Sequence, residues 1–322
     1  MRAWLAIAVL AACGDNRDVP ALPLASGAGQ LELVDNTLVF SRNGNPVLTF
    51  GAGAFVVGTV DDLDSGASFD PYWLFVDSPM EPDGLAWHES GTLHVEISDA
   101  STLVLSFGVP GGDATLAFTP SDSGCFRAVF STSVPNAAFM RVRPDADGSE
   151  GFYGLGEWGD SIEHRGKLRP MQLEVDTTLE SSNNEAHVPV PLIVGTRGWG
   201  LFVKSDRPGA FDVARQTDTL IDVTFGTAED SATGLEFHLL SADTALDVYK
   251  PYYEVTGYPG LPALWAYGPL LWRDENDSQA QVLDDIQQIR TRDLATSGIW
   301  FDRPYASGVN TFDWSPARFP DP

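Results

Sequence analysis

The chain has 322 residues, of which 43% are hydrophobic, so it can bury a substantial core in one large domain or in two ordinary ones. It has 19 Lys and Arg residues and 45 Asp and Glu residues. The resulting formal net charge of −26 excludes nucleic acid as a partner, because no basic surface is left to neutralise phosphates. The 31 glycines, 22 prolines and nine tryptophans favour short strands and turns over long helices.

The N-terminal residues have the pattern of a bacterial lipoprotein signal. Arg2 supplies a positive charge, an apolar run follows, and Leu10-Ala11-Ala12-Cys13 resembles the lipoprotein cleavage box. This pattern predicts that residues 1–12 are removed and that Cys13 carries a diacylglyceryl group. The protein would then be extracytoplasmic and held on a bacterial membrane by a lipid anchor. An ordinary secretory signal, which gives a secreted or periplasmic protein, is the alternative.

Residues 13–29, rich in Pro, Ala, Ser and Gly, predict a flexible tether, and residues 30–241 predict a large antiparallel β-sandwich. The clearest hairpin lies between residues 38 and 50, where Asn43-Gly44 supplies the positive φ angles of a tight turn. Short runs of strand-forming residues recur without amphipathic helices between them, at residues 92–97, 102–107, 114–118, 126–130, 200–204, 220–225 and 235–240.

The pattern changes at residues 242–260, which predict a connecting helix and a linker. The helix is expected from Asp243 to Thr256 and ends at Gly257. Pro251 must lie in an early turn or at a kink, because proline cannot donate a hydrogen bond inside a helix.

Residues 261–322 predict one strand–helix–strand unit of a parallel sheet. The apolar run 265–272 is typical of a strand buried on both faces. Ser278-Gln279-Ala280-Gln281 fits a helix capping box, and apolar residues follow at helical spacing. A second buried strand, residues 297–301, ends at Asp302.

Three separated motifs stand out in the second half of the chain. They are Phe152-Tyr153-Gly154-Leu155-Gly156-Glu157, then Thr256-Gly257-Tyr258-Pro259-Gly260-Leu261-Pro262 with Trp265-Ala266-Tyr267-Gly268, and Phe312-Asp313-Trp314-Ser315-Pro316-Ala317-Arg318-Phe319-Pro320-Asp321-Pro322. Together they resemble glycoside hydrolase family 31, which contains α-glucosidases and α-xylosidases. The resemblance covers roughly residues 150–322. It implies a mutarotase-like β-sandwich that leads into a (β/α)8 barrel. The sequence departs from the family at Trp272-Arg273-Asp274-Glu275 and at Ser315, where aspartate is common.

A complete barrel takes about 250 residues, whereas 62 residues follow Gly260, enough for one or two βα units. The resemblance implies a retaining, exo-acting α-glycosidase that hydrolyses O-glycosyl bonds and whose catalytic aspartates lie beyond residue 322. We therefore expect no catalytic residue in this chain and no activity of the chain alone. The alternative is a non-catalytic, lipid-anchored surface protein whose β-sandwich binds carbohydrate.

The resemblance also suggests residues that would contact an α-linked oligosaccharide or glycoside. Asp302 matches an aspartate that holds the sugar at the cleavage subsite, and Asp176 matches a loop of the sandwich that contacts the neighbouring sugar. Trp272 and Trp300 either stack on sugar C–H faces or belong to the core. Arg273 pairs either with an acidic substrate or with a carboxylate inside the barrel.

No cofactor and no metal are expected. Asp61-Asp62-Leu63-Asp64 and Asp145-Ala146-Asp147 lack the ligand spacing of a calcium loop. The five histidines are scattered and are interpreted as structural. Beyond Cys13 only Cys125 is left, so an acylated Cys13 excludes an intramolecular disulfide.

Overall fold

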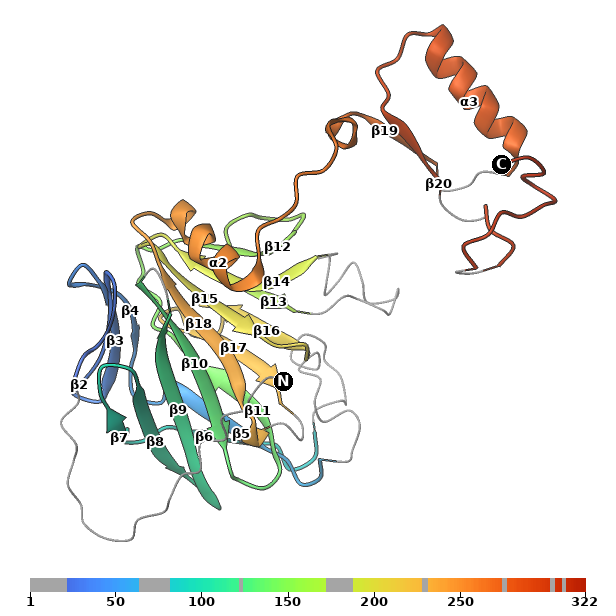
Figure 1. Ribbon diagram of the computed structural model, residues 1–322. Helices are drawn as coiled ribbons and strands as arrows, with labels where there is room; N and C mark the ends of the chain where they lie inside the picture. The colour runs from blue at the N-terminus through green and yellow to red at the C-terminus, as the bar shows by residue number, and fades with distance from the viewer. Residues whose placement is uncertain are drawn as a thin grey trace, which may run out of the picture. The chain divides into compact units, whose positions relative to one another are not determined.

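The computed structural model describes residues 22–63, 82–121, 124–171, 188–227, 231–273, 277–301, 305–308 and 311–322 (Figure 1). The chain divides into two compact units, the first ending at Gly257 and the second running from Tyr258 to Pro322. The division lies inside the predicted linker, residues 242–260.

The first unit is mainly β, and its strands pair antiparallel, as the sequence predicted. The tether predicted over residues 13–29 is wrong at its C-terminal end, because Leu24–Ser26 forms a strand and Leu24 is buried in the core. A four-stranded sheet has the order β1-β2-β3-β4, an eight-stranded sheet the order β12-β14-β15-β18-β10-β9-β8-β7, and a six-stranded sheet the order β13-β16-β17-β11-β5-β6. The strands are β1 (Leu24–Ser26), β2 (Gly29–Val34), β3 (Thr37–Arg42), β4 (Asn45–Phe50), β5 (Phe55–Thr59), β6 (Ala86–Glu89), β7 (His94–Ser98), β8 (Leu103–Val109), β9 (Gly112–Ser121), β10 (Cys125–Thr132), β11 (Ala137–Val142), β12 (Phe152–Gly156), β13 (Lys167–Pro170), β14 (Pro189–Gly195), β15 (Trp199–Lys204), β16 (Gly209–Val213), β17 (Ile221–Gly226) and β18 (Leu235–Ser241).

One continuous hydrophobic core takes side chains from all three sheets. Phe55 of the six-stranded sheet meets Phe130 of the eight-stranded sheet edge-on, with ring centroids 6.1 Å apart. Phe40 of the four-stranded sheet meets Phe126 in the same way at 5.6 Å. Edge-to-face contacts of this kind add to the free energy gained from burying the rings.

The predicted hairpin around Asn43-Gly44 is confirmed as β3 and β4. Asn43 has φ +51° and Gly44 has φ +77°, the left-handed pair that a two-residue hairpin turn requires. The connecting helix also agrees with the prediction, since a 3₁₀ turn, η4 (Ala245–Val248), leads into α2 (Tyr249–Thr256), with Pro251 in its first turn. Gly257, at φ +91°, ends the helix.

In the second unit, the strand predicted over residues 265–272 is wrong in its position and its burial. Residues Leu264–Tyr267 form a 3₁₀ turn, η5, and the strand β19 covers only Leu270–Arg273. The N–H of Gly268 donates to the carbonyl of Trp265 and closes the turn, and Pro269 has no N–H to pair in a sheet. Leu270 is 45% exposed, so β19 is not buried on both faces.

The rest of this unit follows the predicted strand–helix–strand order. Helix α3 (Gln279–Thr291) begins at Ser278, whose hydroxyl accepts from the Gln281 N–H at 3.3 Å, while the Gln281 side chain accepts from the Asp277 N–H at 2.9 Å. The predicted N-cap is thereby confirmed, but Gln281 bonds the N–H of Asp277, one residue before the N-cap, and not that of Ser278 as in a capping box. Strand β20 (Gly298–Phe301) then pairs in parallel with β19. The prediction that this strand is buried is wrong, since none of its residues is fully buried and Trp300 is exposed. In the described part of the chain, no helix is both long and apolar enough to cross a membrane.

Candidate functional site

The parallel strands of the second unit bring two of the predicted sugar-contacting residues together. Trp272 on β19 lies directly opposite Trp300 on β20, and each is 60% exposed. Arg273, the next residue along β19, forms an ion pair with Asp285 of α3, with a nitrogen–oxygen distance of 3.3 Å. Because side chains alternate along a strand, Arg273 lies on the side of α3 and both indoles lie on the opposite face.

The other predicted residues cannot be placed. Asp302, Asp176 and Cys13 lie outside the described residues. Within the described ranges, no three His, Cys, Asp or Glu side chains gather in a way that could hold a metal ion. The structure therefore defines a pair of exposed tryptophans and an internal ion pair at this end of the βαβ unit.

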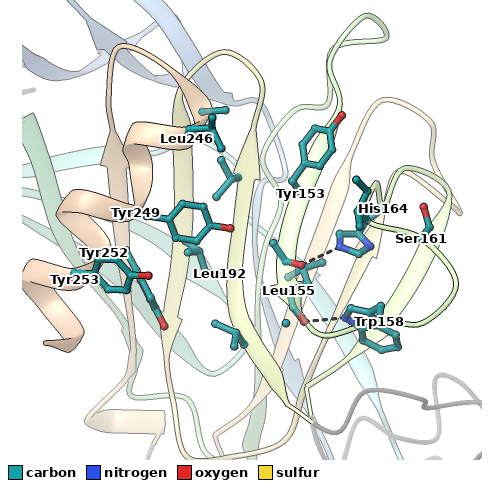
Figure 2. Close-up of a pocket in the computed structure, with 16 residues that line it drawn as sticks. Tyr153, Leu155, Trp158, Ser161, His164, Leu192, Leu246, Tyr249, Tyr252 and Tyr253 are labelled. Carbon is teal, nitrogen blue, oxygen red and sulfur yellow. Dashed lines mark hydrogen bonds between the residues drawn. The ribbon is translucent and has the colours of Figure 1, made fainter. Parts of the chain in front are cut away.

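The first unit contains a second candidate, a cleft of about 680 Å³ that the sequence analysis missed (Figure 2). It lies between β12 and β14 on one side and η4 and α2 on the other. Its lining residues are Tyr153, Gly154, Leu155, Gly156, Trp158, Ser161, Ile162, His164, Val190, Leu192, Val194, Ala245, Leu246, Tyr249, Tyr252 and Tyr253. No Asp, Glu, Lys or Arg is among them.

The wall of this cleft on the side of β12 includes a strained tripeptide. Gly154, Leu155 and Gly156 have φ angles of +98°, +59° and +93°, and the register with β14 shifts across them. A side chain could not replace either glycine without a clash, since a Cβ on Gly154 would lie 2.4 Å from the Leu192 carbonyl oxygen and one on Gly156 would lie 2.0 Å from that of Val188. The tripeptide lets Leu155 turn into the core, where it is fully buried.

Residues 157–166, which follow β12, are fixed by side-chain contacts. The Trp158 indole donates to the Leu155 carbonyl at 2.8 Å, and the Arg169 guanidinium lies 4.2 Å from the centre of the Trp158 ring. Arg169 also binds Asp160 at 2.8 Å. These contacts hold this wall of the cleft in one arrangement.

His164 is part of the same wall and is neutral. Its Nε2 lies 2.9 Å from the Gly154 carbonyl oxygen, and its Nδ1 accepts from Arg169 Nε at 3.1 Å. Nε2 must then carry the proton, because the carbonyl can only accept and the guanidinium can only donate. Burial lowers the pKa of His164 from its ordinary value, and this favours the same uncharged form.

The opposite wall is formed by tyrosines on α2. Tyr249 and Tyr253 stand one turn apart, with ring centroids 6.3 Å apart, and Tyr252 packs edge-on against Phe202 of β15 at 5.1 Å. Residues at i, i+3 and i+4 share one side of a helix, so Tyr249-Lys250-Pro251-Tyr252-Tyr253 contained a signal for an aromatic face. Nothing in the sequence indicated that β12 would lie opposite it.

Residues 259–322 match the model of the glycosyl hydrolases family 31 TIM-barrel domain. Among curated proteins, an alpha-glucosidase of Saccharolobus solfataricus is 28% identical over 185 residues, which cover 56% of this chain and 26% of that protein. An isomaltosyltransferase of Sporosarcina globispora is 24% identical over 232 residues, which cover 70% of this chain and 20% of that protein. The chain thus spans about a fifth to a quarter of the length of these curated relatives.

Among solved structures, a GH31 family sulfoquinovosidase from E. rectale, in complex with the aza-sugar inhibitor IFGSQ, has a TM-score of 0.61 and 18% sequence identity to this chain. The match covers 91% of this chain and 45% of that one, and it shows that the two share a fold. The barrel-domain match, the curated relatives and the shared fold agree with the three motifs in the sequence. Residues 259–322 are therefore a segment of a glycoside hydrolase family 31 TIM-barrel domain, and the chain as a whole is similar to proteins of that family.

Proposed function

We propose that this chain is the N-terminal part of a retaining, exo-acting α-glycosidase that hydrolyses O-glycosyl bonds in an α-linked oligosaccharide or glycoside. The observation that carries the proposal is the match of residues 259–322 to the family's TIM-barrel domain. The parallel pairing of β19 with β20 across α3 supports it, because a (β/α)8 barrel is built from such units.

In this proposal the residues of the second unit bind sugar and do not cleave it. Trp272 and Trp300 offer a paired aromatic surface to sugar C–H faces. Asp302, directly after β20, accepts hydrogen bonds from sugar hydroxyls at the cleavage subsite, and Asp176 contacts the neighbouring sugar. Arg273 is held by Asp285 and supports the strand end.

Bond cleavage requires two further carboxyl groups. A retaining glycosidase places an ionised nucleophile and a protonated acid about 5–5.5 Å apart on either side of the scissile bond. Resemblance to the family assigns both to later barrel strands, beyond residue 322. The 322-residue chain should accordingly bind sugar without hydrolysing it.

The test compares this chain with the product that the source cells make. An antibody raised against residues 30–241 would give the size of the native product, which is then purified and assayed on aryl α-glycosides with NMR detection of the released anomer. We expect a product longer than 322 residues that releases the α-anomer first, and no turnover by the 322-residue chain. Turnover by the 322-residue chain, or release of the β-anomer, would contradict the proposal.

We also propose that Cys13 carries a lipid that anchors the protein outside the cytoplasm. The support is the sequence Leu10-Ala11-Ala12-Cys13 after a short apolar run. Metabolic labelling with an alkyne fatty acid should mark the wild-type protein and not the Cys13→Ser variant. Equal labelling of both would refute acylation, and a soluble, cleaved, unlabelled protein would indicate an ordinary secretory signal.

A non-catalytic surface protein with a carbohydrate-binding sandwich is the second candidate function. The aromatic, uncharged cleft between β12, β14 and α2 is the observation that favours it. A native product of 322 residues that binds saccharides and cleaves none would select this candidate over the glycosidase.

A further inference from the structure

The cleft of the first unit concentrates one residue type. Tyr153, Tyr249, Tyr252 and Tyr253 are half of the eight tyrosines in the chain, and Trp158 joins them in the lining. Tyrosine carries an apolar ring and a hydroxyl that both donates and accepts hydrogen bonds. A surface with these rings and hydroxyls suits a ligand that has apolar C–H faces and hydroxyl edges.

The charge of the lining narrows the class of ligand. One residue in five of this chain is charged, yet none of the sixteen lining residues is Asp, Glu, Lys or Arg. His164 adds no charge, because both of its ring nitrogens have partners that fix the neutral form. Among the described lining residues no basic side chain can pair with a phosphate or a carboxylate, and burying an unpaired anion is costly. The lining therefore disfavours an anionic ligand.

The geometry is that of a preformed site for a small molecule. The volume of about 680 Å³ lies within the roughly 300–1,000 Å³ of typical ligand clefts. Figure 2 shows the Tyr249 ring on α2 and the Tyr153 ring on β12 on opposite sides of the space, with Leu192 between them. The two rings are 36% and 37% exposed, so each is available to a ligand.

We propose that this cleft binds a neutral saccharide, which stacks on Tyr249 and Tyr153 and exchanges hydrogen bonds with their hydroxyls. The proposal does not rest on hydrolysis, since none of the described lining residues has a carboxyl group that could act on a glycosidic bond. It deepens the second candidate function, a carbohydrate-binding sandwich, by naming the residues that would contact the sugar.

The test is isothermal titration of the full 322-residue chain with maltotriose, isomaltotriose and xylotriose, and with trigalacturonic acid as the anionic comparison. We expect saturable binding of at least one neutral trisaccharide and none of the acid. Tyr249→Ala should weaken binding about tenfold, because it removes a stacking ring, and Tyr249→Phe should weaken it less, because it keeps the ring. Tyr267→Ala, at a 65% exposed tyrosine of the second unit, is the matched control and should change nothing.

Two further variants separate this cleft from the sugar contacts proposed on the barrel strands. Tyr153→Ala repeats the test from the opposite wall and covers the case in which the Tyr249 variant fails to fold. Trp272→Ala removes the exposed indole of β19. If Trp272→Ala abolishes binding and both tyrosine variants keep it, the cleft proposal is wrong and the barrel proposal gains support.

A protein partner is the competing occupant, because Ile162 and Leu246 in the lining of the cleft are 81% and 83% exposed. Sedimentation velocity across a concentration series checks for self-association through these side chains. A dimer that Leu246→Asp dissociates, together with no binding of any neutral trisaccharide, would overturn the saccharide proposal.

Discussion

The glycines of β12 allow a quantitative test of how the cleft is built. Gly156 has φ +93°, and a Cβ there would lie 2.0 Å from the carbonyl oxygen of Val188 and 2.8 Å from the Val190 nitrogen. Gly156→Ala thus combines a left-handed backbone angle, which costs about 1–2 kcal/mol for a residue with a Cβ, with a backbone clash that costs about 1–3 kcal/mol to relieve. We expect a loss of about 3 kcal/mol in the free energy of unfolding.

Two other glycines separate these contributions. Gly166 has φ +76° with nothing within 4 Å of its Cβ position, so Gly166→Ala should lose only about 1 kcal/mol. Gly148 has neither a left-handed φ nor a close neighbour. Gly148→Ala should be neutral or stabilise by up to about 1 kcal/mol, because alanine reduces the entropy of the unfolded chain.

Urea unfolding followed by far-UV circular dichroism measures the series in the full chain, since eighteen of the twenty described strands lie in the first unit. Midpoint shifts multiplied by a common slope give the differences in free energy. We expect Gly148→Ala to be the most stable of the three variants, Gly166→Ala to be intermediate and Gly156→Ala to be the least stable. A Gly156→Ala protein within about 0.5 kcal/mol of Gly148→Ala would refute the argument.

The position of β12 in its sheet adds a second readout. Among the described strands, β12 lies at the edge of its sheet and pairs with β14 alone, so the chain can relieve the clash by detaching β12 locally. Amide hydrogen exchange in β12 and β14 should then be faster in Gly156→Ala than in Gly166→Ala. Equal exchange rates in the two variants would mean that the clash at Gly156 is relieved without detachment of β12 from β14.

Three further outcomes are expected. Burial lowers the pKa of His238 although Glu236 accepts from its Nε2 at 3.1 Å, so the unfolded chain takes up a proton first as the pH falls. The stability that this difference contributes is complete above the unfolded pKa of about 6.5 and is lost between that value and the lower folded pKa. Urea midpoints measured from about pH 7.5 to 5.5 should therefore fall more steeply for wild type than for His238→Gln, and parallel curves would contradict this. Asp160→Asn should lower the free energy of unfolding by about 1 kcal/mol, because it removes the charged partner of buried Arg169. The loss stays this small because Asp160 is 38% exposed and water screens the pair. An unchanged urea midpoint would show that the pair contributes nothing. Brief chymotrypsin treatment should cut first in the exposed aromatic segment after Gly257, and the mass of the surviving fragment reports this; simultaneous loss of both units would count against the division of the chain.

Local sequence determined the elements that have strong local signals. Asn43-Gly44 specified a hairpin because few other residues tolerate two positive φ angles in succession. Ser278 and Gln281 specified the start of α3 because their side chains satisfy N–H groups that no helical carbonyl reaches. Both signals lie within four residues of the structure that they predict.

The apolar run 265–272 shows that a local signal does not always predict where a strand begins. Its composition suits a strand, but the chain turns at Gly268 and only four residues, Leu270–Arg273, pair with β20. Hydrophobicity indicates that a segment will be covered, whereas the hydrogen bonds available to Gly268 and Pro269 decide where extended pairing begins. An apolar pattern alone therefore could not tell a segment that is merely buried from one that pairs as a strand.

The cleft lay beyond sequence reasoning for a different reason. Tyr153 and Tyr249 are separated by more than ninety residues, and they face each other because β12 pairs with β14 and α2 packs on β15. The pairing depends in turn on Gly154 and Gly156, whose side-chain-free positions admit the β14 backbone. The motif around Leu155 was visible as a family resemblance, but its physical role is to bend a strand so that one wall of an uncharged recess forms. If the proposed saccharide binds there, the two glycines position the site without touching the ligand, and Gly156→Ala should weaken saccharide binding even under conditions in which the sandwich stays folded.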